Sequence, residues 1–174
     1  MKIFLIGYRC TGKTTIGGIL AQCLNFDFID TDRLIEQHLE STILEIIEKQ
    51  GWEKFRQIEK QTLLNTKKKI NTVIATGGGI IIDHDNQQFI RKHGFCVWLD
   101  ADIKTIMDRL NTDNKTRTSR PPLTNKDLFI ETNEIVKIRK PLYKNTAHIR
   151  IDVSFHTPEE IVNIIDRRLK DVRQ

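Results

Sequence analysis

The sequence predicts an α/β fold of three layers, in which a central parallel sheet of five strands is covered by helices on both faces. Short apolar segments alternate with longer segments of helical character along the 174 residues, as in sheets whose parallel strands are joined by helices. The first apolar segment, residues 2–6, leads directly into GYRCTGKT at 7–14, the pattern of a phosphate-binding loop between a strand and a helix. The length suits a single domain, so we expect residues 1–174 to form one.

The remaining elements follow from the same alternation. Asp102 precedes an apolar helical face, and Thr157 followed by Pro158 is typical of a helix start. Strands are expected at 2–6, 27–30, 72–75, 94–99 and 147–151. Helices are expected at 13–24, 31–40, 43–50, 52–69, 84–93, 102–111, 126–140 and 158–171.

The composition is that of an ordinary globular protein with a small excess of positive charge. Lys and Arg number 28 against 23 Asp and Glu, which gives a net charge of +5, and hydrophobic residues make up 39% of the chain. A basic balance suits either nucleic acid or a small polyanion. Because no RNA-binding aromatic motif is present, we favour a small anionic metabolite over nucleic acid.

The cysteines and the apolar runs indicate the compartment. Cys10, Cys23 and Cys96 are odd in number and lack CxxC spacing, so neither a disulfide framework nor a zinc site is expected. No run approaches the ~18 apolar residues of a membrane span, and the N-terminal run is too short for a signal peptide. We therefore expect a cytoplasmic protein that contacts no membrane.

The loop at 7–14 predicts binding of a nucleoside triphosphate. Backbone N–H groups of such a loop and of the following helix converge on one point, where the helix dipole also favours negative charge. Gly7 and Gly12 permit the turn, Lys13 offers a charge to the outer phosphates from a solvent-facing loop, and the Thr14 hydroxyl can bind Mg²⁺. The alternative is a plain glycine turn. The expected nucleotide-binding residues are Cys10, Thr11, Gly12, Lys13, Thr14 and Thr15.

Two further patterns follow the second and third strands, at the sheet edge where ligands gather. Asp30 and Asp32 end the second strand, where one carboxylate can face a metal and the other a substrate, or both can be helix-capping acids. Gly77, Gly78 and Gly79 follow the third strand and suit a close approach of a ligand to the main chain, or a plain turn.

The segment from Asn111 to Lys126 stands apart, because it is polar and contains two consecutive prolines between two helical patterns. A loop of this length is either disordered or functional. Arg117 and Arg120 favour a functional lid, since either arginine could reach a bound nucleotide.

Together these motifs resemble the shikimate kinase family of P-loop proteins. The resemblance spans nearly the whole chain and implies a P-loop kinase fold with a mobile lid at about 112–125 and a substrate-binding helical region at about 31–60. The motifs that carry it are the phosphate loop, FIDTD at 28–32, FR at 55–56, ATGGG at 75–79, RPPL at 120–123 and RKPLY at 139–143.

The resemblance implies ATP-dependent phosphorylation of shikimate at its 3-hydroxyl, a step of aromatic amino-acid biosynthesis. Thr14 and Asp30 would serve Mg²⁺, and Asp32 would meet the hydroxyl that is phosphorylated. Lys13 and Arg120 would act on the ATP phosphates, so that the catalytic residues are Lys13, Asp32 and Arg120.

The resemblance also assigns the rest of the site. Arg56 and Arg139 would hold the carboxylate of the substrate. Gly77, Gly78 and Gly79 would line the other side of the substrate. Arg109 and residues 154–157 are candidates for the adenine contact. A monomer is expected.

Two departures from the family pattern stand in this chain. Cys10 replaces a glycine that is common in the phosphate loop, and the lid is extended before Arg120 so that Arg117 competes for its role.

The alternatives to this function are another small-metabolite kinase, such as a gluconate kinase, and a nucleotide-binding regulator without turnover. Retention of Lys13, Thr14 and both aspartates weighs against the regulator.

Overall fold

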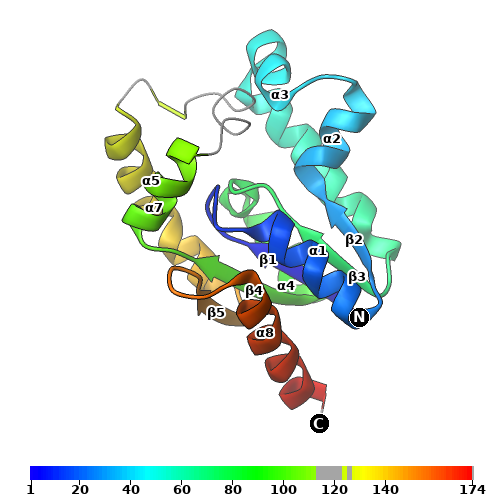
Figure 1. Ribbon diagram of the computed structural model, residues 1–174. Helices are drawn as coiled ribbons and strands as arrows, with labels where there is room; N and C mark the ends of the chain where they lie inside the picture. Colours follow the sequence, from blue (N-terminus) through cyan, green and yellow to red (C-terminus); the bar gives the residue numbers. More distant parts are fainter. Residues whose placement is uncertain (113–122, 125–126, 174) are drawn as a thin grey trace.

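All five strands run parallel in one sheet of order β2-β3-β1-β4-β5 (Figure 1). The computed structural model describes residues 1–112, 123–124 and 127–173. The predicted sheet is confirmed, with strand bounds that differ from expectation by at most two residues. The strands are β1 (Lys2–Ile6), β2 (Asp27–Asp30), β3 (Thr72–Ala75), β4 (Phe95–Asp100) and β5 (Ile149–Asp152).

The helices have bounds close to those expected, and two short 3₁₀ helices accompany them. A further finding is that no helix in the described part of the chain has the length and apolar character needed to cross a membrane. The helices are α1 (Lys13–Leu24), α2 (Thr31–Leu39), α3 (Ile43–Asn65), α4 (His84–His93), α5 (Ile103–Thr112), α7 (Leu128–Thr146) and α8 (Pro158–Arg173), with η1 (Thr66–Lys68) and η2 (Ile80–Ile82).

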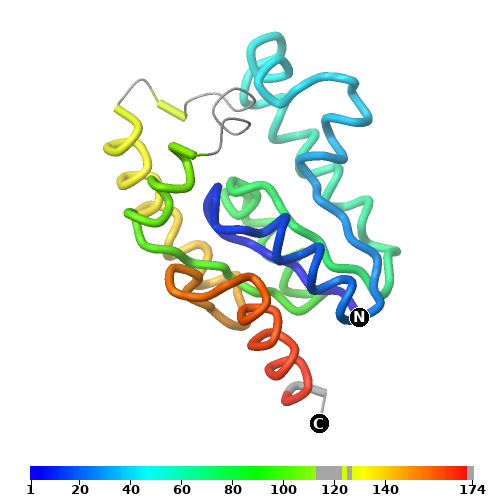
Figure 2. Tube along the Cα trace, viewed as in Figure 1, coloured from blue at the N-terminus to red at the C-terminus, as the bar shows by residue number. Residues whose placement is uncertain are grey.

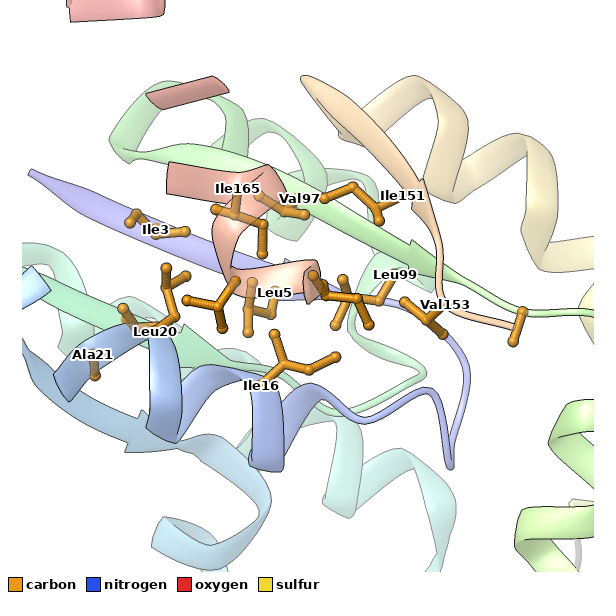
Figure 3. Packing of buried hydrophobic residues seen from close by; sticks show 14 of the residues in the cluster. Ile3, Leu5, Ile16, Leu20, Ala21, Val97, Leu99, Ile151, Val153 and Ile165 are labelled. Atoms are coloured by element: carbon orange, nitrogen blue, oxygen red, sulfur yellow. The ribbon is translucent and has the colours of Figure 1, made fainter. Parts of the chain in front are cut away.

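The side chains of β1 alternate between two hydrophobic clusters and so define the three layers. Ile3 and Leu5 pack with α1, α5 and α8 on one face of the sheet, as Figure 3 shows for α1 and α8. Phe4 and Ile6 pack on the other face with α4, η2 and Tyr143 of α7. Successive residues of a strand point to opposite faces, so a strand that is apolar throughout must be covered on both sides.

The break expected between the helices at 43–50 and 52–69 is confirmed, because Gly51 within α3 has φ of 80° and ψ of 167°, which are not helical. Two helix ends need correction. The second of these helices ends at Asn65, and residues 66–68 form η1. The helix expected to end before Pro141 continues to Thr146. Proline removes one backbone hydrogen bond, but Tyr143 and Thr146 are buried, so packing maintains the helix beyond it.

The order of the strands brings the functional segments to one edge of the sheet. Because β1, β2 and β3 are adjacent and parallel, residues 7–12, Asp30 and residues 76–79 all follow carboxyl ends at the same edge. Figure 2 traces the chain from β1 through residues 7–12 into α1. Any ligand of these segments therefore binds where three strands end.

Candidate active site

The phosphate loop connects β1 and α1, as predicted. Gly7 and Gly12 have φ of 146° and 87°, and the helix begins at Lys13, so the backbone has the conformation that only glycine adopts readily. Cys10 also lies in the left-handed region, with φ of 62°. A glycine at this position would adopt that conformation without strain, which gives the departure from the family pattern a physical meaning.

Side chains of the loop stabilise its shape from within. The Lys13 ammonium donates hydrogen bonds to the carbonyls of Gly7 at 2.9 Å and Tyr8 at 2.6 Å. The Thr11 hydroxyl donates to the same Tyr8 carbonyl at 2.9 Å. The loop faces an open hollow, as expected, but Lys13 itself is only 9% exposed, because its ammonium turns back onto the loop.

A broad hollow, here called the loop cleft, lies over the phosphate loop. Of the six expected nucleotide-binding residues it includes all but Thr11, whose side chain is buried inside the loop. Arg109 borders the cleft and donates to the carbonyls of Cys10 and Val153, both at 3.2 Å. Within the candidate stretch 154–157, His156 lines the cleft.

Thr14 and Asp30 lie side by side in the loop cleft. The Thr14 hydroxyl donates to Oδ2 of Asp30 at 2.6 Å. Oδ1 of Asp30 accepts from the backbone N–H groups of Asp32 and Arg33, so this carboxylate also caps α2. The capping interpretation and the metal interpretation are therefore compatible, since each uses a different oxygen of Asp30.

A second hollow, here called the arginine pocket, lies between α2, α3, α7 and the glycine run. It is lined by charged and aromatic side chains and by the glycine backbone. Its lining residues include Tyr8, Arg9, Asp32, Trp52, Phe55, Arg56, Glu59, Gly77, Gly78, Gly79, Leu123 and Arg139. The structure thus brings together every substrate-binding residue that the sequence indicated.

The two arginines are held in place by hydrogen bonds. Arg56 donates to Glu59 at 2.5 Å, and its guanidinium also lies over the ring of Trp52, at 5.2 Å from the centroid. Arg139 donates to the carbonyl of Gly78 at 3.2 Å, and the Tyr143 hydroxyl donates to the same oxygen at 2.6 Å. Both guanidinium groups therefore border the pocket in fixed positions, as a bidentate carboxylate site requires.

The glycine run makes room for charged side chains of the protein itself. A Cβ on Gly77 would lie 2.5 Å from a carboxylate oxygen of Glu59 and 2.7 Å from one of Asp32. A Cβ on Gly79 would overlap the guanidinium of Arg56. The run is thus more than a plain turn, because a side chain at Gly77 or Gly79 would displace charged groups of the arginine pocket.

Sequence reasoning missed Glu59, which is 1% exposed at the base of the arginine pocket. Burial raises the pKa of Glu59, and the nearby Asp32 carboxylate raises it further, whereas Arg56 and Arg139 act in the opposite direction. Its position three residues after Arg56 on α3 is a signal that could have identified the pair.

The loop cleft and the arginine pocket meet. Arg9, Asp32 and Ile43 line both hollows, so a phosphate on the loop and a hydroxyl in the pocket would come together beside Asp32. Arg9 was also missed, because nothing in its sequence context separates it from a surface arginine. Arg117 and Arg120 lie outside the described residues.

A phosphate loop that opens onto a pocket with two fixed arginines has the architecture of a P-loop phosphotransferase for a small anionic acceptor. The family model described as "Shikimate kinase" matches residues 9–170. This chain belongs to the shikimate kinase family, and it is accordingly an ATP-dependent kinase.

Shikimate kinases from several bacteria are similar to this chain over nearly its whole length. The chain is 41% identical to shikimate kinase 2 of Yersinia enterocolitica over 97% of this chain and 95% of that protein. It is 42% identical to shikimate kinase 2 of Enterobacter sp., with the same coverage. The structure of the Acinetobacter baumannii shikimate kinase in complex with shikimate superposes with a TM-score of 0.91 at 31% identity, covering 98% of this chain and 93% of that one.

Cys10 provides a direct probe of the loop cleft. We expect Mg²⁺-ATP to slow alkylation of Cys10, because this residue lines the loop cleft and precedes the N-terminus of α1, where a helix dipole favours a thiolate. Cys23 lies exposed on α1, so it is the internal control. Cys96 is buried, and burial raises the pKa of its thiol. Mass spectrometry after brief alkylation measures the labelling of Cys10 and Cys23. Equal labelling of Cys10 with and without nucleotide would mean that its thiol points away from the bound phosphates.

Proposed function

We propose that this chain transfers the γ-phosphoryl group of ATP to the 3-hydroxyl of shikimate at the junction of the loop cleft and the arginine pocket. The observation that carries this assignment of the site is the sharing of Asp32 by the two hollows. The shikimate oxygen forms a bond to the γ-phosphorus, the bond from that phosphorus to the β,γ-bridging oxygen breaks, and the hydroxyl proton passes to Asp32. The products are shikimate 3-phosphate and ADP.

The protein contributes mainly position and charge to this reaction. ATP phosphates bind the amides of residues 7–14, and Lys13 exchanges its hydrogen bonds to the loop carbonyls for bonds to phosphate oxygens. Arg120 closes from the proposed lid at about 112–125 and adds charge. Arg109 and His156 mark the end of the cleft where the adenine binds.

Arg56 and Arg139 hold the shikimate carboxylate by paired N–H donors. Glu59 and the Gly78 carbonyl fix the two guanidinium groups, so little side-chain entropy is lost when the substrate binds. The substrate-binding region at about 31–60 supplies both Asp32 and Arg56. It therefore supplies the contact to the acceptor hydroxyl and one of the two arginines, while Arg139 comes from α7.

The pair Thr14 and Asp30 fits a magnesium ion. Both offer the hard oxygen ligands that Mg²⁺ prefers, and they lie within 2.6 Å of each other in the loop cleft. No cluster of three or more His, Cys, Asp or Glu suited to a metal occurs among the described residues. This donor set matches Mg²⁺, which binds proteins through few side chains and completes its coordination with water and phosphates. The ion would neutralise charge on the phosphates.

We further infer a single-domain monomer that works in the cytoplasm. The 174 residues have the length of one domain. All three cysteines are free thiols, which suits a reducing compartment. Light scattering of the purified protein tests the oligomeric state.

Incubation with Mg²⁺-ATP and shikimate, followed by assays of ADP and shikimate 3-phosphate, tests the proposed reaction. ADP formation that depends on shikimate is the expected result. Gluconate in place of shikimate tests the related-kinase alternative, and binding of ATP without turnover would indicate the regulator. Omission of Mg²⁺ should abolish turnover.

Lysine in place of either arginine should weaken shikimate binding by about 10-fold or more, because a lysine cannot donate two parallel hydrogen bonds to a carboxylate. The variants are Arg56→Lys and Arg139→Lys, measured by titration calorimetry with shikimate and with ATP separately. Arg150→Lys is the control, since Arg150 lies on the edge strand β5, outside both hollows, where it donates to Asp100 of β4. Equal weakening of both ligands would indicate a general structural role for the two arginines.

A further inference from the structure

A buried ion pair joins the phosphate loop to α7. Arg9 donates to Oε1 of Glu131 at 2.5 Å, across 122 residues of sequence. Arg9 is 8% exposed and Glu131 is 1% exposed. Nε of Arg9 also donates to the Tyr8 hydroxyl at 3.2 Å, so its guanidinium is fixed from two sides.

Stability alone is a poor explanation of this pair. Removing two charges from water costs about as much as their attraction returns, so a well-packed apolar pair would serve the fold equally well. Arg9 is also one of the three residues that line both the loop cleft and the arginine pocket. The pair therefore places a positive charge at the point where the two substrates meet.

Glu131 has a second set of partners. Its other carboxylate oxygen, Oε2, accepts from the backbone N–H of Thr124 at 2.6 Å and from the Thr124 hydroxyl at 3.1 Å. Leu123, the residue before Thr124, lines the arginine pocket. One buried carboxylate thus fixes the position of an arginine from the phosphate loop and of a backbone segment that lies against the pocket.

We propose that Glu131 is a positioning residue for phosphoryl transfer, which holds the Arg9 guanidinium at the junction of the loop cleft and the arginine pocket while anchoring Thr124. Arg9, so held, binds the transferring phosphoryl group, whose charge spreads over its outer oxygens during transfer. A preorganised donor of this kind acts on the transition state more than on the ground state. The proposal rests on the proposed function.

The test compares Glu131→Gln, Arg9→Met and the double variant. Glu131→Gln should lower kcat by about 10-fold or more with smaller changes in the KM values, because the guanidinium is no longer held by a charged partner in the position that serves the transition state. Since Glu131 acts through Arg9, the double variant should be no slower than Arg9→Met alone. Glu134→Gln removes a carboxylate from the exposed side of the same helix and is the matched control. Thermal unfolding of each variant gives the accompanying change in stability.

Several results would overturn the inference. A Glu131→Gln enzyme with lower thermal stability but unchanged kcat would show a structural role only, and effects that multiply in the double variant would show that the two residues act independently. If Glu131→Gln does not fold, Glu131→Asp is the second variant, because it keeps the negative charge but draws the carboxylate away from Arg9. An unchanged kcat in Glu131→Asp overturns the inference as well. If the wild-type protein forms no ADP in response to shikimate, the proposed function itself is wrong. Failure of the proposed function is thereby distinguished from failure of the inference about Glu131.

Discussion

Alanine in place of Lys13 is expected to lower kcat by about 10²-fold or more, the loss seen when a preorganised charged donor is removed from a transition state. Lys13 is the first residue of α1, and its ammonium donates to the carbonyls of Gly7 and Tyr8 within the phosphate loop. The same ammonium closes the loop through two backbone carbonyls, so we also expect a modest loss of stability. Steady-state kinetics and thermal unfolding measure the two effects separately.

Lys2→Ala is a matched control for this variant. Lys2 is also a buried lysine, and its ammonium likewise donates to two backbone carbonyls, those of Thr66 and Lys67. It belongs to β1, whose opposite end carries the phosphate loop. Lys2→Ala should therefore lower stability and leave kcat unchanged. An active Lys13→Ala enzyme would refute the assignment of the phosphate loop.

The three layers of the fold, and the edge of the sheet that carries the site, could be predicted from the sequence because each depends on local patterns. Runs such as residues 3–6 are apolar at every position, which requires cover on both faces, and the loop at 7–14 fixes the direction of the first strand. Glycines and aspartates that follow parallel strands then fall at one edge, so Asp32 and Gly77 are brought together by topology alone.

What the sequence did not reveal depends on contacts between distant segments. Arg9 and Glu131 are ordinary charged residues in their own surroundings, and only the packing of α7 against the phosphate loop makes them a pair. The continuation of α7 past Pro141 has the same origin, because burial of Tyr143 outweighs a local helix-breaking residue. The burial of Lys13 could not be predicted either, because its hydrogen bonds to the loop carbonyls depend on how the backbone of the loop turns.

Asparagine in place of Asp32 is expected to lower kcat by about 10²- to 10⁴-fold, the range for loss of a general base. The substitution keeps the shape of the side chain but removes the carboxylate that we propose orients the hydroxyl and accepts its proton. Asp32 is buried where the loop cleft and the arginine pocket meet, so bulk water is poorly placed to replace it. ATP affinity should change little, because the phosphate loop is untouched.

Asp85→Asn distinguishes this role from helix stabilisation. Asp32 and Asp85 occupy the same position in the first turn of α2 and α4, two residues after the capping aspartates Asp30 and Asp83. If Asp32 served only the helix dipole, the two variants would show similar small losses of stability, of about 0.3–1 kcal/mol, and no loss of activity. We expect Asp85→Asn to keep full kcat, and Asp32→Asn to bind ATP and shikimate while turning over slowly. A folded Asp32→Asn enzyme with kcat within about threefold of wild type would show that the proton leaves by another path, since general-base catalysis accounts for far more than that.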